Sequence, residues 1–318
     1  MKIERVCILG GTGFVGRHLV TAMANSGRQV RVLTRRRERH RENLVHPTVE
    51  IVSARVRDIE TLAERFQGVD CVLFLPGILN QSKQVTFRDV HVNFARQVSE
   101  ACIKAGVKRV LHMSALNADA ANGASEYLRT KGEGEDIMHL AAGAGIQVTS
   151  FRPSVIFGHD DSFFNRFADL LRISPVMPLA CPDARFAPVY VGDVSGAFVN
   201  ALENQSSFGK RLELCGPDIY TLKQLVEYTA RMLGARRLVL PLSQGLSQAM
   251  AKVMHYAPGT PLTPDNVKSM QLDSVCRENG FAVLGMTPQS VQCIMPAALQ
   301  NRTSRGQYGR YRKSANRD

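Results

Sequence analysis

The chain has 318 residues, of which 44% are hydrophobic and 21% are charged. This length and balance are those of a globular protein with one large domain or two coupled ones, and they exclude a collagenous, coiled-coil or wholly disordered chain. The 40 Lys and Arg against 28 Asp and Glu give a formal charge of +12, and two basic segments, residues 31–41 and 301–318, carry most of the excess.

Strand-like apolar runs alternate with helical stretches through the first half of the chain. The predicted strands are residues 4–9, 29–34, 49–53, 70–75, 108–113 and 147–151. This alternation is typical of stacked βαβ units around a parallel sheet. We therefore predict an α/β protein with a doubly wound parallel sheet and a smaller C-terminal α/β region.

A proline-rich, less regular part follows residue 151. It contains helical patterns at residues 193–203, 221–233 and 244–255 and a strand-like run at residues 211–215. We expect residues 1–155 to form the main domain, with a helix at 193–204 packed against it. Residues 156–192 and 205–300 are expected to form a substrate or partner region. Residues 301–318 lack periodicity and are expected to form a disordered basic tail.

A glycine-rich turn joins the first strand to the first helix. Its residues are Gly10, Gly11, Thr12, Gly13, Phe14, Val15 and Gly16. Glycines let the backbone turn sharply and approach a pyrophosphate, whose charge then lies at the positive end of the helix. Because strand, turn and helix follow in the required order, the pattern predicts a dinucleotide site in a Rossmann-like domain rather than a purely structural turn.

Arginines follow the second predicted strand, where an NAD-selective site places an acidic residue on the ribose. Arg35 and Arg36 stand there instead, and a guanidinium matches the 2′-phosphate of NADP. We therefore predict a preference for NADP(H) over NAD(H), the alternative being a solvated basic loop. Asp58, after the third strand, is either a contact to the adenine amino group or the N-cap of a helix at residues 59–66.

Ser114, Tyr127 and Lys131 form a candidate catalytic group. Residues four apart on a helix share one face, so the Lys131 ammonium can lower the pKa of the Tyr127 phenol and also reach the cofactor ribose. Tyr127 would then protonate a substrate carbonyl oxygen that Ser114 polarises, while the nicotinamide delivers hydride. A Tyr-Lys pair at this spacing is common by chance, but here it follows a phosphate loop and five strands.

The predicted helix at residues 244–255 is amphipathic. Leu246, Met250, Val253 and Met254 recur on one side of it. Such a face usually covers a core. The alternatives are a lid over a quinone-like pocket and a contact with a membrane surface or a membrane-bound partner, which the basic tail would assist by attraction to anionic lipid.

Other classes of site receive no support from the sequence. The longest nearly apolar run, residues 71–79, is too short to span a membrane. No basic-then-apolar leader precedes the first strand, so we expect a cytoplasmic protein, at most peripheral at the inner face of the membrane. The seven cysteines are odd in number and form no CxxC pair, so they are expected to be reduced core residues. We assign no metal site and expect no nucleic-acid partner.

These motifs together resemble the short-chain dehydrogenase/reductase superfamily, in its extended or atypical branch. The similar segments are the glycine-rich turn, Asn93, Ser114, the Tyr127 and Lys131 pair, and residues 152–158 and 189–194, in the order of the family. The resemblance implies a nicotinamide nucleotide. It also implies further nucleotide contacts, made by Leu75, Pro76, Gly77, Asn93, Pro153 and Val155.

Within that superfamily the chain is particularly similar to the nucleotide-binding accessory subunit of respiratory complex I and its bacterial relatives. Residues 114–118, 127–135, 157–167 and 262–267 carry this likeness. It implies a structural NADPH and a link to respiratory-chain or quinone metabolism, with a protein complex or a quinone-like hydrophobic substrate as partner. The alternative is an active NADPH-dependent reductase or epimerase acting on a carbonyl of a quinone precursor or nucleotide sugar.

Overall fold

A seven-stranded parallel sheet organises the molecule. The computed structural model describes residues 2–35, 46–53, 58–234, 237–256 and 262–300. The sheet has the order β11-β6-β5-β4-β1-β2-β3. Its strands are β1 (Arg5–Leu9), β2 (Gln29–Thr34), β3 (Val49–Ser53), β4 (Cys71–Phe74), β5 (Arg109–Met113), β6 (Gln147–Pro153) and β11 (Arg211–Leu214). The order reverses between β1 and β4, as in doubly wound nucleotide-binding folds.

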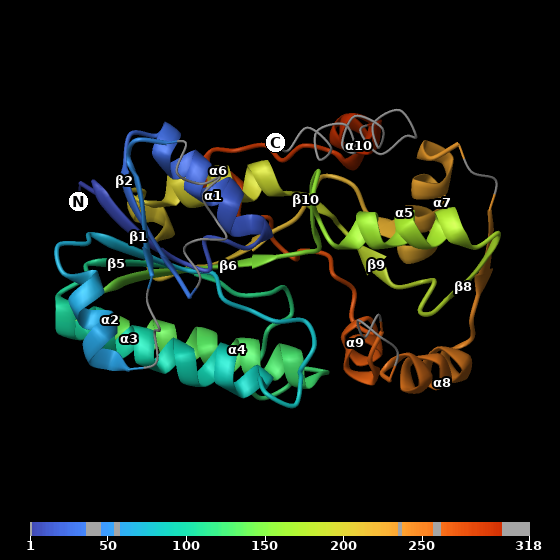
Figure 1. Ribbon diagram of the computed structural model, residues 1–318, viewed down its shortest axis with the longest axis horizontal. Coiled ribbons are helices and arrows are strands. Elements are labelled where there is room, and N and C mark those ends of the chain that lie inside the picture. The colour runs from blue at the N-terminus through green and yellow to red at the C-terminus, as the bar shows by residue number, and fades with distance from the viewer. Residues whose placement is uncertain (1, 36–45, 54–57, 235–236, 257–261, 301–318) are drawn as a thin grey trace, which may run out of the picture.

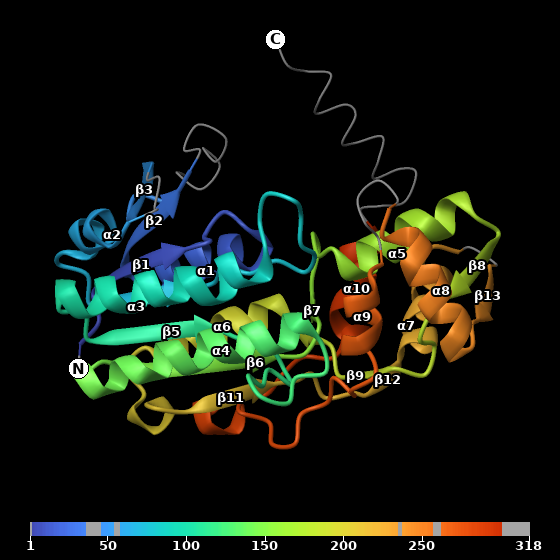
Figure 2. The same ribbon diagram turned by 90° about the horizontal axis from the view of Figure 1, so that it is seen from below.

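Helices cover both faces of this sheet (Figures 1 and 2). On one face lie α1 (Phe14–Asn25) and α6 (Val191–Ala201); on the other lie α2 (Ile59–Phe66), α3 (Phe94–Ala105) and α4 (Glu126–Leu140). Strands buried on both faces must be almost wholly apolar, and every residue of β4 and β5 is buried. The expected α/β fold is confirmed. β4 is a continuous apolar run, whereas β5 also buries Arg109 and His112.

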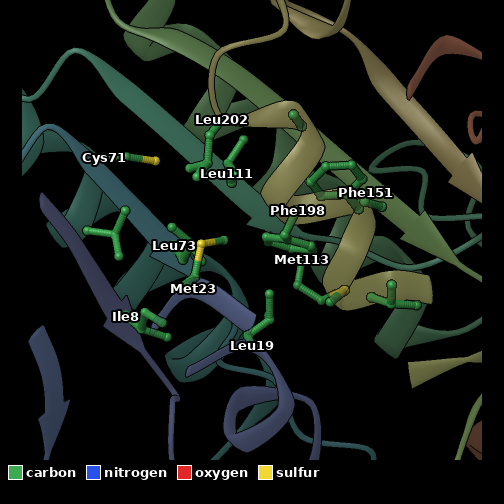
Figure 3. Close-up of a cluster of buried hydrophobic side chains, with 14 of the residues drawn as sticks. Ile8, Leu19, Met23, Cys71, Leu73, Leu111, Met113, Phe151, Phe198 and Leu202 are labelled. Atoms are coloured by element: carbon green, nitrogen blue, oxygen red, sulfur yellow. The ribbon is translucent and has the colours of Figure 1, made fainter. Parts of the chain in front are cut away.

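The core on the α1 and α6 side shows how the layers pack. Figure 3 shows Leu19 and Met23 of α1 and Phe198 of α6 against Leu73, Leu111 and Phe151 of the sheet. The rings of Phe151 and Phe198 lie 4.3 Å apart between centroids. This packing holds the carboxyl ends of β1, β4 and β5, where a dinucleotide site is expected, on a rigid base.

The strand expected at residues 211–215 joins the main sheet. We assigned it by sequence to the smaller region, but β11 pairs in parallel with β6, Leu212 opposite Phe151. A run of four residues that alternates charged with apolar side chains carries no signal of which sheet it enters. The chain thus returns to the main sheet after α6, before it builds most of the smaller region.

The smaller region lies at the carboxyl end of the main sheet (Figure 1). Its helices are α5 (Phe163–Ile173), α7 (Leu222–Met232), α8 (Gln244–Met254), α9 (Pro264–Ser269) and α10 (Val291–Gln300). Its short strands pair two by two. β7 (Ile156–Phe157) pairs with β10 (Val189–Tyr190), β9 (Arg185–Phe186) with β12 (Tyr220–Thr221), and β8 (Val176–Leu179) with β13 (Leu238–Pro241). The exact limits of the two regions stay a prediction, and the basic tail at 301–318 lies outside the described residues.

Four of the seven cysteines differ from the expected reduced core residues. Cys215 and Cys276 form a disulfide, with their Cα atoms 5.9 Å apart. They are 61 residues apart in sequence, so only the tertiary fold shows that they meet. Cys7, Cys71 and Cys102 are free and buried as expected, while Cys181 is half-buried and Cys293 is exposed. In the described part of the chain, no helix is long and apolar enough to cross a membrane.

Candidate functional site

The glycine-rich turn lies between β1 and α1, at the reversal of strand order. Gly10 has a positive φ of 80°, a conformation that glycine adopts without strain. A Cβ on Gly16 would overlap the carbonyl oxygen of Gly10 and the Cα of Gly11, so only glycine allows α1 to begin this close to the turn. Gly13, the N-cap, has no side chain to occupy the first amides of α1. The turn therefore fits a pyrophosphate.

The loop after β4 packs directly against this turn. A Cβ on Gly10 would lie 3.3 Å from both the Leu75 Cβ and the Pro76 nitrogen, and the Leu75 amide donates to the Leu9 carbonyl at 3.1 Å. Gly77 follows, beside the Lys131 ammonium: a Cβ on Gly77 would lie 3.8 Å from Nζ. The structure thus brings the predicted contacts of this loop together with the phosphate turn and with Lys131.

The predicted adenosine end of the site is only partly described. Arg35 is exposed and directly follows β2, while Arg36 lies outside the described residues. The Asp58 carboxylate accepts from the Thr61 amide at 2.7 Å and from the Thr61 hydroxyl at 3.0 Å. These two hydrogen bonds lower the pKa of Asp58. The N-cap alternative for Asp58 is therefore confirmed, and an adenine contact stays a prediction.

Lys131 and Tyr127 project from the first two turns of α4, which Ser125 caps by accepting from the Leu128 amide. The buried Lys131 Nζ donates to the Met113 carbonyl at 2.6 Å, and burial lowers the pKa of Lys131 to about 8. Burial also raises the pKa of Tyr127 to about 12. The sequence predicts a lowered phenol pKa, so the structure reverses that expectation: loss of solvent outweighs any attraction from Lys131.

His91 is a site residue that sequence reasoning missed. Its Nε2 accepts from the Ile78 amide at 3.2 Å, and its Nδ1 lies 3.0 Å from the Thr130 hydroxyl. Burial and the charge of Lys131 lower the pKa of His91 to about 3, so the ring is neutral and, on these contacts, carries its proton on Nδ1. The ring also packs edge-on against Tyr127 at 5.6 Å. His91 therefore ties the loop after β4 to the Tyr127 helix.

A buried ionic network surrounds Ser114. The Ser114 hydroxyl donates to Glu135 Oε2 at 2.7 Å. Glu135 is fully buried, and the Nε atoms of Arg152 and Arg211 lie 3.0 Å and 3.1 Å from its oxygens. A guanidinium carries only donors, so both arginines donate to the Glu135 carboxylate, which also accepts from the Ser114 hydroxyl. The one hydrogen-bond donor of the Ser114 side chain is therefore used in the hydrogen bond to Glu135.

The remaining predicted contacts are placed less centrally. Asn93 is exposed, and its amide donates to Asp89 Oδ1 at 3.5 Å, one turn earlier. Pro153 ends β6, and its carbonyl accepts from the Leu116 amide; the Val155 carbonyl accepts from the Val189 amide. Pro153 and Val155 thus lie at the carboxyl edge of the sheet, whereas the Asn93 side chain is directed to Asp89 on its own helical segment.

Helix α9, in the smaller region, also contacts the site. The Asp265 carboxylate accepts from the backbone amides of Glu126 and Tyr127 at 2.8 Å and 3.1 Å. The Asn266 amide donates to the Leu79 carbonyl at 3.3 Å. Residues 262–267 are a motif in the sequence, but nothing in it shows that these side chains hold the N-terminus of the Tyr127 helix. An acceptor at this helix end also matches the helix dipole.

The sequence is similar to one protein family and to several known proteins. The model of the NAD dependent epimerase/dehydratase family matches residues 6–215. The mouse (Mus musculus) protein NADH dehydrogenase (ubiquinone) 1 alpha subcomplex subunit 9, mitochondrial, is 29% identical over 90% of this chain and 77% of its own length. A ceramide reductase of Caulobacter vibrioides is 30% identical over 78% of this chain and 77% of its own length.

Solved structures share the fold. MoeE5, in complex with UDP-glucuronic acid and NAD, has a TM-score of 0.72 at 20% identity and covers 93% of this chain and 97% of its own. The NADPH-dependent quinone oxidoreductase QOR2 of Escherichia coli, in complex with NADPH, has a TM-score of 0.70 at 20% identity over 90% of this chain and 96% of its own. At this identity the likeness concerns the fold alone.

Proposed function

Since the chain belongs to the NAD dependent epimerase/dehydratase family, we propose that it binds NADP(H) as a held, structural cofactor. In this proposal it is an accessory protein of respiratory-chain or quinone metabolism. The glycine-rich turn holds the pyrophosphate, Arg35 and Arg36 select the 2′-phosphate, and Lys131 donates its remaining N–H groups to the nicotinamide ribose. The bound nucleotide would supply hydride, were an acceptor to reach it.

The hydrogen bond that the Ser114 hydroxyl donates to Glu135 is the observation that supports this proposal most directly. A substrate carbonyl oxygen only accepts hydrogen bonds, so polarising it requires a donor. Ser114 could supply that donor only by leaving Glu135, a buried carboxylate to which it donates at 2.7 Å. A phenol with its pKa raised to about 12 is also not tuned for proton transfer near neutral pH. Both features favour retention of the nucleotide without turnover.

The identity of the relatives supports the proposed partner. The mouse relative is named as a subunit of NADH dehydrogenase (ubiquinone). The 40 kDa subunit of the Neurospora crassa NADH-ubiquinone oxidoreductase is 27% identical over 95% of this chain. We therefore propose a respiratory or quinone-biosynthesis complex as the protein partner. The proposed location is cytoplasmic, peripheral at the inner face of the membrane.

An active NADPH-dependent reductase or epimerase is the second candidate. It is favoured by the presence of Tyr127 and Lys131 on one face of α4, and by the bacterial relative named as a ceramide reductase. In that case Tyr127 is the acid, Lys131 supports it, and the substrate carries a carbonyl on a quinone precursor, a nucleotide sugar or a similarly hydrophobic molecule.

Replacement of Tyr127 by Phe separates the two. If the nucleotide is structural, the Tyr127→Phe variant keeps its NADPH, because the ring packing is unchanged. The variant then also complements a host strain that lacks the native protein. If the protein turns over, the variant binds nucleotide but fails in the host. Tyr228→Phe, in the smaller region, is the matched control. Loss of host function in Tyr127→Phe alone, with nucleotide retained, contradicts the accessory role.

A further inference from the structure

Helices α5 and α8 and strands β8 and β13 lie at the end of the molecule far from the amino edge of the main sheet (Figures 1 and 2). These elements and the residues beside them carry large apolar side chains that are exposed. We call this set the distal apolar surface: Ile173, Val176, Leu238, Leu240, Leu246 and Val253. Ile173 is 84% exposed and Val253 is 72% exposed. Large apolar residues exposed together mark an interaction site more often than single ones do.

The two-stranded sheet in this surface is apolar on both of its faces. In the parallel pair of β8 and β13, Val176 lies opposite Leu238, and Pro178 lies opposite Leu240. These four side chains are exposed, whereas Met177 and Val239, on the other face, are buried. An ordinary solvated sheet face alternates apolar with polar residues. The outer face of this pair therefore lacks the polar side chains that contact with water alone would favour.

Helix α8 continues the surface. It is fixed beside β8 by the Leu242 amide, which donates to the Leu179 carbonyl, and by the Ser247 hydroxyl, which accepts from the Cys181 amide. The helix buries two small residues, Ser247 and Ala251. Leu246 is 59% exposed and Val253 is 72% exposed, whereas Met250 and Met254 are half-buried. The apolar face predicted from sequence is therefore divided, and its Leu246 and Val253 side lies outward.

Basic residues directly precede the apolar ones. Arg172 stands before Ile173, Arg237 before Leu238, and Lys252 before Val253. Residues 163–180 and 237–256 together contain four Lys or Arg and one acidic residue, Asp169, which pairs with Arg172. An apolar side chain beside a cation is the arrangement of segments that lie in the headgroup region of a bilayer. Tyr256, highly exposed after α8, is a residue type enriched at that depth.

We propose that the distal apolar surface docks the protein onto an anionic lipid bilayer. The apolar side chains of β8, β13 and α8 enter the boundary between headgroups and acyl chains. Lys252 contacts lipid phosphate, as do the terminal nitrogens of Arg237, whose Nε donates to the Leu171 carbonyl at 2.6 Å. This surface is separate from the nucleotide site, so the docking does not depend on whether the nucleotide is turned over.

Sedimentation with lipid vesicles tests the docking. The full chain is mixed with vesicles of phosphatidylcholine alone or with one part in three of phosphatidylglycerol, and the bound fraction is measured. We expect binding to the anionic vesicles only. Replacement of Leu246 and Val253 together by Ser should weaken it about tenfold or more, because two apolar side chains leave the lipid. Replacement of Arg237 and Lys252 together by Gln should weaken it about fivefold for each charge removed.

The matched control is Leu140→Ser. Leu140 is 77% exposed but ends α4, at the opposite edge of the main sheet, so its loss should leave vesicle binding unchanged. Nucleotide content and thermal unfolding confirm that each variant is folded. The proposal is overturned if the native chain ignores anionic vesicles, or if it binds them and the Leu246 and Val253 variant binds equally well. The second result assigns any lipid contact to the tail at residues 301–318.

Discussion

The single proton of Ser114 separates the two functions considered for this site. The Ser114 hydroxyl donates it to Glu135, with 2.7 Å between the two oxygen atoms, and Arg152 and Arg211 pair with the same carboxylate. A buried carboxylate is costly unless it is paired, and Glu135 is paired with two guanidinium groups and with the Ser114 hydroxyl. Ser114 therefore supports the fold around the site and has no donor left for a ligand.

Replacement of Ser114 by Ala should accordingly affect stability more than nucleotide binding. We expect the free energy of unfolding to fall by about 1.5–3 kcal/mol, the contribution of a hydrogen bond to a charged group. NADPH content should stay at the native level. Chemical denaturation and nucleotide analysis of the purified variant measure both. Ser206→Ala, at an exposed turn, is the control. A variant that stays stable but loses its nucleotide shows that Ser114 contacts the ligand.

The pKa of Lys131 predicts how nucleotide affinity changes with pH. Its value of about 8 lies below the ordinary 10.5, so between these values the folded protein has released a proton that the unfolded chain keeps. Lys131 therefore makes the free energy of unfolding rise with pH between about pH 8 and pH 10.5. Nucleotide binding follows the opposite direction, because the proposed ribose contact needs the ammonium.

We expect the Kd for NADPH to be constant from pH 6 to pH 7.5 and to rise above about pH 8, approaching tenfold per pH unit. Fluorescence titration at each pH measures it. A Lys131→Arg variant keeps its charge through this range, so its Kd should not change with pH. If native protein and variant show the same pH profile, the ammonium of Lys131 does not hold the nucleotide.

At the scale of elements, the glycine-rich turn depends on how closely α1 approaches β1. Gly16→Ala should abolish nucleotide retention, because its Cβ would overlap the Gly10 carbonyl and force the turn apart. Gly143→Ala is the control, since a Cβ there meets nothing within 4 Å. Nucleotide content after purification and thermal unfolding distinguish loss of the site from loss of the fold. Full retention of NADPH by Gly16→Ala contradicts a pyrophosphate site at this turn.

The strands and helices of the main sheet were largely predictable from the sequence. β2 and β3 have the predicted bounds, and α2 spans the predicted residues 59–66. Strands buried on both faces are mostly apolar, and the helices between them have a clear period, so both signals are local. The position of β11 in the main sheet and the outward face of α8 were not predictable, because they depend on which surfaces meet in the fold.

The site was predictable to the extent that its residues belong to local motifs. The turn at residues 10–16 and the pair of Tyr127 and Lys131 are such motifs. Glu135, His91 and Asp265 act on the site through partners 13 to 139 residues away, and no spacing in the sequence indicates these contacts. The raised pKa of Tyr127 was missed for a similar reason, because burial is a property of the folded chain.

At the scale of the whole molecule, α9 connects the smaller region to the nucleotide site. Asp265 holds the start of the Tyr127 helix, and Asn266 holds the loop after β4. The segment then passes along the main sheet, where Cys276 is joined to Cys215. The smaller region is therefore attached both to the helix that carries Tyr127 and to the edge strand of the sheet. A nucleotide held between these elements would stabilise the contact between the two regions.

The central claim is that this protein holds NADPH without using it. The most direct test is to purify the protein without added cofactor, denature it after a day in air, and identify the released nucleotide and its redox state. We predict mostly NADPH, still reduced, because the Ser114 hydroxyl donates to Glu135 and the pKa of the Tyr127 phenol is raised. Mostly NADP⁺, or an empty site that refills readily, would contradict the account and identify an exchangeable cofactor of an active reductase.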